Sequence, residues 1–135
     1  MESRKGFTIF ELMVVIIIIS ILAAVIVPIM QGRIDSAKWS EGKAIMGIIA
    51  RALRIHVGEK GNNFTPVPTV VELGFEPGDL DGTYFSGGES GTNDFSWIIN
   101  SNDPIDFMVT ATAPEGVDSP SKITLNHAGV FIETP

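Results

Sequence analysis

The sequence contains no cysteine and only two histidines in 135 residues. Without cysteine, the chain can form neither a disulfide framework nor a thiolate zinc site. A nucleophile with a histidine base would have to use His56 or His127, and no motif surrounds either residue. We therefore predict that the chain is not an enzyme and that both histidines are structural or solvated.

Basic residues are scarce in the C-terminal part of the chain. Between residues 61 and 135, Lys122 alone stands against eleven acidic residues, which leaves a net charge of −10 there. Residues 31–60 carry six basic and three acidic residues, a net charge of +3. An acidic C-terminal part repels phosphate backbones, so no specific nucleic-acid partner is predicted.

Four acidic residues of this part, Asp79, Asp81, Glu89 and Asp94, lie in or near a glycine-rich stretch. Carboxylates in flexible loops are the ligands that calcium takes. The stretch lacks the fixed ligand spacing of a calcium loop, so a solvated acidic loop is the favoured interpretation. Calcium is kept as the weaker alternative, and no other cofactor is predicted.

The most prominent feature is an apolar run over residues 7–30, which is interrupted by Thr8, Glu11, Ser20 and Pro28. As a helix, this run would extend roughly 30 Å by residue 27, enough to cross a bilayer. The run is too long for a secretory signal, and no polar mature start follows its small residues. A basic pair, Arg4 and Lys5, precedes it and predicts that the N-terminus stays in the cytoplasm.

Beyond Pro28, apolar residues recur at three- and four-residue spacings, which predicts an amphipathic helix over residues 31–58. Pro28 removes one helical hydrogen bond, so a kink or a loose segment is expected near it. Gly58 and Gly61 signal the end of the helix. The expected apolar stripe consists of Ile34, Ala37, Glu41, Ala44, Ile45, Ile48, Ala52, Leu53 and Ile55.

The remaining residues, 59–135, predict a small globular head with a β-sheet. Segments rich in β-branched and aromatic residues alternate there with turn residues, which is typical of an antiparallel meander. Strands are expected at Thr83–Ser86, Phe95–Asn100, Asp106–Thr112, Lys122–Asn126 and Val130–Thr134. So small a sheet needs the amphipathic half of the helix as its second layer. The predicted fold class is α+β, with a long N-terminal helix packed on a small C-terminal antiparallel sheet.

The N-terminal stretch Arg4-Lys5-Gly6-Phe7-Thr8-Ile9-Phe10-Glu11, followed by the apolar run with Pro28 near its far end, resembles the class III signal of type IV pilins and type II secretion pseudopilins. The resemblance implies a pilin-like fold and a leader peptide of residues 1–6. It also implies that a prepilin peptidase cuts between Gly6 and Phe7 and that the new amine of Phe7 is methylated.

Glu11 is expensive to bury in lipid unless its charge is paired. The resemblance implies that, in a filament of parallel helices, Glu11 meets the amine of Phe7 on a neighbouring subunit, with Pro28 as a further assembly residue. The basic side chains of Arg33, Lys38 and Lys43 could face acidic residues on a neighbour's head, or they could be matched within one subunit.

The function implied is that of a structural subunit of a type IV pilus, used in adhesion or motility. It would be stored in the inner membrane as a single-pass protein and polymerised by an assembly machinery into an extracellular helical homo-oligomer. One alternative is a pseudopilin of a type II secretion system, in a periplasmic pseudopilus. The other is a membrane-anchored monomeric binding protein with an acidic head.

Overall fold

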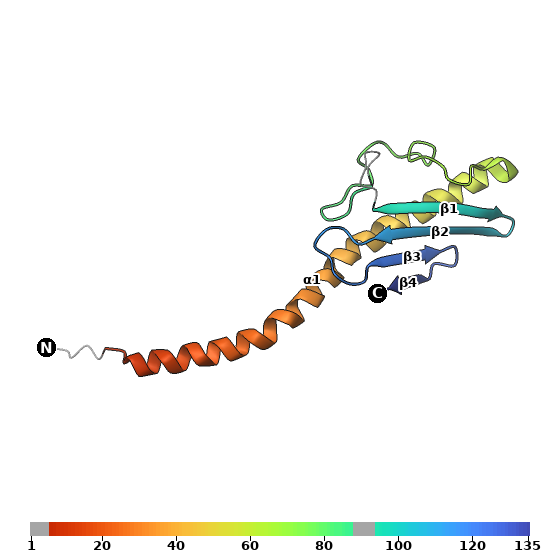
Figure 1. The fold of residues 1–135 in the computed structure, drawn as a ribbon. Helices are drawn as coiled ribbons and strands as arrows, with labels where there is room; N and C mark the ends of the chain where they lie inside the picture. Colours follow the sequence, from red (N-terminus) through yellow and green to blue (C-terminus); the bar gives the residue numbers. More distant parts are fainter. Residues whose placement is uncertain (1–5, 88–93) are drawn as a thin grey trace. The chain divides into compact units, whose positions relative to one another are not determined.

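The computed structural model describes residues 6–87 and 94–135. Its elements are one long helix, a short 3-10 turn and four strands (Figure 1). Contacts divide the chain into two compact units, Met1–Ile34 and Asp35–Pro135. The elements are α1 (Ile9–Lys60), η1 (Gly61–Asn63), β1 (Phe95–Asn102), β2 (Ile105–Thr112), β3 (Lys122–Asn126) and β4 (Phe131–Thr134).

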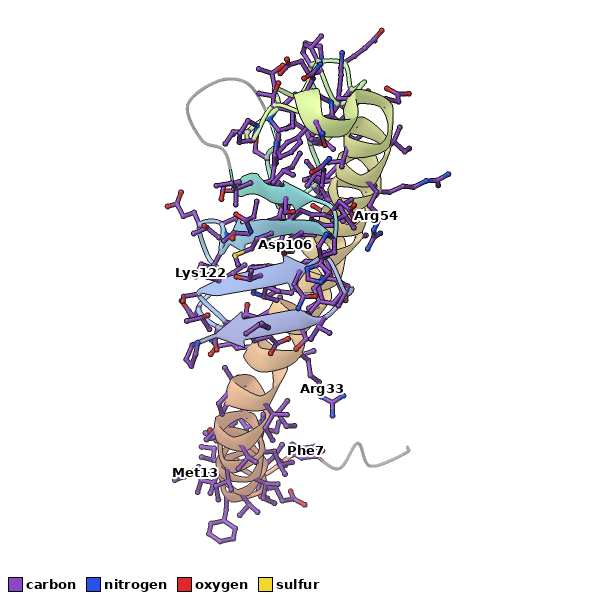
Figure 2. All side chains as sticks on the ribbon, turned by 90° about the vertical axis from the view of Figure 1, so that its right-hand side faces the viewer. Phe7, Met13, Arg33, Arg54, Asp106 and Lys122 are labelled. Carbon is purple, nitrogen blue, oxygen red and sulfur yellow. The ribbon has the colours of Figure 1, made fainter. Side chains whose placement is uncertain are left out.

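The first unit consists of the N-terminal part of α1. Its large apolar side chains between residues 7 and 30 are 41–81% exposed, and Figure 2 shows side chains on all sides of this helical segment. The hydroxyl of Ser20 donates to the carbonyl of Ile16 at 2.7 Å, so this polar group is satisfied within the helix. The backbone stays helical through Pro28.

The second unit contains a four-stranded sheet in which β1, β2, β3 and β4 follow one another and each strand is antiparallel to the next. Trp97 pairs with Val109, Val109 with Leu125, and Leu125 with Phe131, which aligns one row across all four strands. This arrangement confirms the predicted meander and the α+β fold class.

The core lies between the second half of α1 and one face of the sheet. The aromatic ring of Phe85 joins these layers, with its centroid 5.0 Å from that of Trp39 and 5.6 Å from that of Phe95. The buried helix residues are Trp39, Gly42, Ile45, Met46, Ile49, Ala50, Ala52, Leu53, His56 and Val57. The sheet contributes Phe95, Trp97, Ile99, Phe107, Val109, Ala111, Ile123 and Leu125.

The predicted apolar stripe on the helix is partly wrong. Ile45, Ala52 and Leu53 are buried as expected, but Ile34, Ile48 and Ile55 are about half exposed, at 48–52%. Ile48 and Ile55 are seven residues apart, so they lie on one face of the helix, and this face is outside the core. The sheet instead packs on the face that carries Trp39, and no residue spacing alone could choose between two apolar faces.

The predicted strand at Thr83–Ser86 is also wrong, because this segment is irregular. Its backbone amides are bound by a helix side chain instead of by a neighbouring strand. The carboxylate oxygen Oε1 of Glu41 accepts from the N–H of Tyr84 at 2.8 Å and from the N–H of Phe85 at 3.2 Å. The segment therefore lies on α1, which places the ring of Phe85 in the core.

Candidate functional site

The start of α1 is built by Thr8 and Glu11. The backbone N–H of Glu11 donates to Thr8 Oγ1 at 3.2 Å, while the N–H and hydroxyl of Thr8 donate to Glu11 Oε2 at 3.1 and 3.0 Å. This reciprocal arrangement is a capping box, which satisfies backbone donors that have no partner inside a helix. The carboxylate of Glu11 thus has a partner within its own subunit, which the sequence interpretation overlooked.

The sequence does hold the signal for this cap. The spacing Thr-x-x-Glu before an apolar run is the pattern of a capping box. Thr69 and Glu72 repeat the same arrangement in the head, where the N–H and hydroxyl of Thr69 donate to Glu72 Oε2 at 2.8 and 3.1 Å. These bonds lower the pKa of Glu72, with a smaller opposing effect of burial.

Gly6 and Phe7 come directly before the cap and lie outside the helix. Both residues are exposed, Phe7 at 80%, and a Cβ atom added at Gly6 would meet no atom within 4 Å. The peptide bond between them is therefore accessible in the free chain. Residues 1–5, with Arg4 and Lys5, lie outside the described residues. Cleavage at Gly6 and methylation at Phe7 remain predictions from the sequence.

The helix that follows the cap presents an uncovered apolar surface. By length and composition it is suited to cross a membrane, and its most apolar part is not buried against any described residue. Burying one large apolar side chain stabilises by about 1.5–3 kcal/mol relative to leaving it in water. The segment of Phe7 to Met30 therefore needs either lipid or other protein around it (Figure 2).

Three basic residues of the helix, Lys38, Lys43 and Arg54, bind within the same subunit. The ammonium group of Lys38 donates to the carbonyl of Gly116 at 2.8 Å, and that of Lys43 pairs with Glu133 Oε1 at 2.8 Å. The guanidinium of Arg54 likewise donates to a carbonyl in the turn between β3 and β4, at 3.0 Å. The structure thus favours matching within one subunit for Lys38 and Lys43.

Glu41 has a structural role that the sequence interpretation missed, because it was placed in the apolar stripe. Burial raises the pKa of Glu41, but the hydrogen bonds donated by Tyr84, Phe85 and Thr83 together lower it by more than burial raises it. The pKa of Glu41 therefore lies below its ordinary value. The charged carboxylate is therefore the form that the fold stabilises. It holds the segment around Phe85 against the helix.

The weak calcium candidates are engaged by neighbouring backbone groups. Asp81 Oδ1 accepts from the N–H of Gly87 at 2.9 Å, and Asp94 Oδ2 accepts from the N–H of Ser86 at 2.8 Å. Asp79 Oδ2 accepts from the N–H of Glu76 at 2.8 Å. Glu89 lies outside the described residues. In the described ranges, no three acidic or histidine side chains are grouped to hold a metal ion. The solvated acidic loop stays the favoured prediction from the sequence, with calcium as the weaker alternative.

The two histidines occupy different surroundings. His56 is buried, with Nδ1 3.4 Å from the carbonyl oxygen of Glu72. His127 is exposed in the turn between β3 and β4, with Nδ1 2.8 Å from Asp106 Oδ1. The pKa of Asp106 is lowered, first by the amide of Asn100 and then by this bond.

Comparison with known proteins finds one family model and several curated relatives that are similar to this chain. Residues 1–27 match the family model described as the prokaryotic N-terminal methylation motif. The type II secretion system core protein G of Pseudomonas aeruginosa is 43% identical over 55 residues, which cover 41% of this chain and 39% of the relative. Core protein G of Klebsiella michiganensis is 43% identical over 49 residues, covering 36% and 33% of the two chains.

The protein of the same name from Escherichia coli is 34% identical over 65 residues, covering 48% of this chain and 43% of the relative. The chain thus matches less than half the length of these curated relatives. No solved structure matches the chain. The methylation motif and the relatives support the resemblance of the chain to type IV pilins and type II secretion pseudopilins, a family of structural, non-enzymatic subunits.

Proposed function

We propose that this chain is a pseudopilin, a structural subunit of a type II secretion apparatus. The observation that carries the proposal is that the three relatives are all named type II secretion system core protein G. They favour the pseudopilin alternative over the type IV pilus subunit that the sequence interpretation placed first. The uncovered apolar helix supports storage in the inner membrane before assembly into a periplasmic pseudopilus.

The geometry at the start of α1 fits the processing that this function requires. Cleavage after Gly6 would turn the backbone nitrogen of Phe7 into a charged amine, one residue from the N–H of Thr8 that Glu11 already binds. The described bonds of Glu11 use oxygen Oε2. The second oxygen, Oε1, is thus left for the amine of Phe7 on a neighbouring copy, while the cap keeps the carboxylate in place.

Assembly would replace lipid by copies of the same helix. A head-to-tail contact between identical subunits generates an open helical array, which suits a filament. In such an array, a subunit docked in the wrong axial register would leave both the amine and Glu11 buried without a partner. The charge pair would thus contribute mainly to the choice of register.

The first experiment is mass spectrometry of the N-terminus after coexpression with a prepilin peptidase. The mature chain is expected to begin at a methylated Phe7. A Gly6→Val variant should keep the leader, because a branched side chain then blocks access to the backbone. An intact Met1 in the unmodified chain would instead support the membrane-anchored binding protein.

A second experiment separates the pseudopilus from the pilus. Deleting the gene in its own host should abolish secretion of extracellular enzymes and leave surface pili unchanged, with restoration by the intact gene as the control. Loss of surface pili with normal secretion would contradict the proposal and support the pilus subunit.

A further inference from the structure

A groove with one cationic end lies along α1, near the end of its apolar run. The groove has a volume of about 230 Å³ and is lined by Ile26, Ile29, Met30 and Arg33. Residues at these spacings share one face of a helix, so the three apolar side chains form a wall that ends at the guanidinium. All four residues belong to the first compact unit. We call this feature the Arg33 groove.

The charge of Arg33 is not matched in the part of the chain that the structure describes. The side chain is exposed and extends away from the helix, as Figure 2 shows. Neither ion pair among the described residues includes its guanidinium. Side chains three and four positions away are the neighbours on a helix surface, and none of these is acidic here. Asp35 points about 200° away around the helix.

Arg33 and Glu11 bracket the apolar part of α1, and no charged residue lies between them. At a rise of about 1.5 Å per residue, they are about 33 Å apart along the helix. The hydrocarbon core of a bilayer is about 30 Å thick. With the N-terminus in the cytoplasm, as predicted from the sequence, Arg33 reaches the phosphate groups of the periplasmic leaflet. This step rests on storage in the inner membrane, which is part of the proposed function.

The two ends of the groove together indicate the chemistry of its ligand. A guanidinium group donates two parallel N–H bonds to a phosphate, and the pair is charge-assisted. The apolar wall of Ile26, Ile29 and Met30 suits an acyl chain. A phospholipid joins these two groups in one molecule. A headgroup with a net negative charge is favoured, because a zwitterionic headgroup carries an ammonium that competes for the phosphate.

We propose that the Arg33 groove binds one anionic phospholipid of the periplasmic leaflet before assembly. Its phosphate binds the guanidinium of Arg33, and one acyl chain packs on the apolar wall. The bound lipid fixes the depth of the helix, because moving Arg33 into the hydrocarbon core would break this pair and bury the charge.

The test uses the full-length chain in nanodiscs of phosphatidylcholine, with one chain in each disc, so that no neighbouring copy can occupy the groove. The probe is a trace of phosphatidylglycerol with a photoreactive group on the upper part of one acyl chain. Mass spectrometry of peptides after irradiation locates the labelled residues. Label is expected on Ile26, Ile29 and Met30 in preference to Ile19, which is as exposed as Ile29, at 58% each.

Variants identify the side chains that hold the lipid. Arg33→Gln should reduce labelling of the groove about tenfold, the loss expected for one charged hydrogen-bonded pair. Arg33→Lys keeps the charge without the two parallel N–H bonds and should reduce labelling about threefold. Arg51→Gln removes the same charge from another exposed position of α1 and should change nothing. Ile29→Phe fills the groove and should reduce labelling, whereas Ile19→Phe should not.

Competition separates the phosphate from the acyl chain. Unlabelled phosphatidylglycerol should displace the probe. Dioleoylglycerol, which has acyl chains but no phosphate, should not displace it, and neither should inorganic phosphate. Fluorescence of the buried Trp39 and Trp97 shows that the head is folded in each variant.

The proposal is overturned if label spreads evenly along the apolar run, or if Arg33→Gln and Arg51→Gln have equal effects. Displacement by dioleoylglycerol would overturn recognition of the phosphate, and displacement by inorganic phosphate would overturn the role of the acyl chain. Flotation with phosphatidylcholine vesicles tests membrane anchoring separately. A chain that floats but has no labelled groove contradicts this proposal alone, while a chain that does not float contradicts storage in the membrane as well.

Discussion

Two substitutions at the start of α1 separate the capping role of Glu11 from its proposed role in pairing with an amine. Thr8→Val removes the hydroxyl that accepts from the N–H of Glu11, but the charge of Glu11 stays. Glu11→Gln removes the charge, but the side-chain oxygen can still accept from the N–H of Thr8, which is 3.1 Å away in the structure. Each variant therefore removes mainly one of the two roles.

The expected magnitudes differ enough to be measured. Loss of a threonine cap destabilises a helix by about 1 kcal/mol. Two opposite charges about 4 Å apart attract by roughly 4 kcal/mol at an effective dielectric constant near 20, before the cost of desolvation. Removing one partner of a buried pair costs about 3–5 kcal/mol, because the other charge is left alone. Thr8→Val should thus weaken assembly about fivefold, and Glu11→Gln more than a hundredfold.

The assay is filament formation by the full-length chain with its assembly machinery, measured by cross-linking in cells and by electron microscopy of filaments released from the periplasm. Mass spectrometry confirms that each variant is cleaved before assembly is compared. Thr69→Val and Glu72→Gln provide the matched controls, because they alter the second capping box of the same chain. Both controls should assemble like the unmodified chain.

Two results would refute the reasoning. If Glu11→Gln assembles as well as the unmodified chain, the carboxylate acts only as a helix cap and has no paired amine. If Thr8→Val assembles as poorly as Glu11→Gln, the cap itself controls assembly, and the two roles are not separable.

Three predictions concern the head and can be checked by chemical denaturation of the full-length chain in detergent, followed by tryptophan fluorescence. Gly42→Ala should destabilise the head by about 1–3 kcal/mol, because the added Cβ would lie 2.7 Å from the Phe85 ring. Gly47→Ala should instead stabilise the chain by about 0.5–1 kcal/mol, because a Cβ added there meets no atom within 4 Å. Equal effects of the two substitutions would contradict the contact between Gly42 and Phe85. Phe85→Ala should cost about 3–5 kcal/mol through the cavity it leaves in the core, so a loss below about 1 kcal/mol would contradict the position of the ring. Glu41→Gln should lower the free energy of unfolding by about 1 kcal/mol at pH 7, because solvent around the partly exposed carboxylate weakens the interactions that are lost. Because the pKa of Glu41 is lowered on folding, the stabilisation by its carboxylate is fully present above the ordinary glutamate pKa of about 4.3 and is lost as the pH falls through the folded-state pKa. If the stability of the Gln variant depends on pH in the same way as that of the unmodified chain, the bonds from Tyr84 and Phe85 to Glu41 are contradicted.

Much of the fold could be predicted because its signals are local. Proline is tolerated inside α1 at residue 28, and the helix ends at Lys60, next to the glycines that signal its end. Four of the five expected strands occur, separated by the expected turns. The Thr-x-x-Glu spacing of the N-terminal cap was equally local, so Thr8 could have been identified as a partner of Glu11 from the sequence.

The errors concern features that depend on distant residues. Thr83–Ser86 has the composition of a strand, yet the carboxylate of Glu41 binds its amides and fixes it on the helix. Ile48 and Ile55 have the spacing of a buried face, yet the sheet packs on the face that carries Trp39. For Lys38 and Lys43 the sequence left two alternatives open, because their partners Gly116 and Glu133 lie far along the chain.

The sequence by itself determined the membrane-competent helix, the N-terminal methylation motif and the resemblance to pilins and pseudopilins, because each depends on residues close together in the first 30 positions. Only the tertiary structure decided which helix face enters the core, which loop Glu41 holds, and which groups Lys38 and Lys43 bind. These features arise from contacts between residues tens of positions apart. Periodicity and composition report the local preference of a segment, and the packing of distant segments selects among the faces and edges that this preference allows.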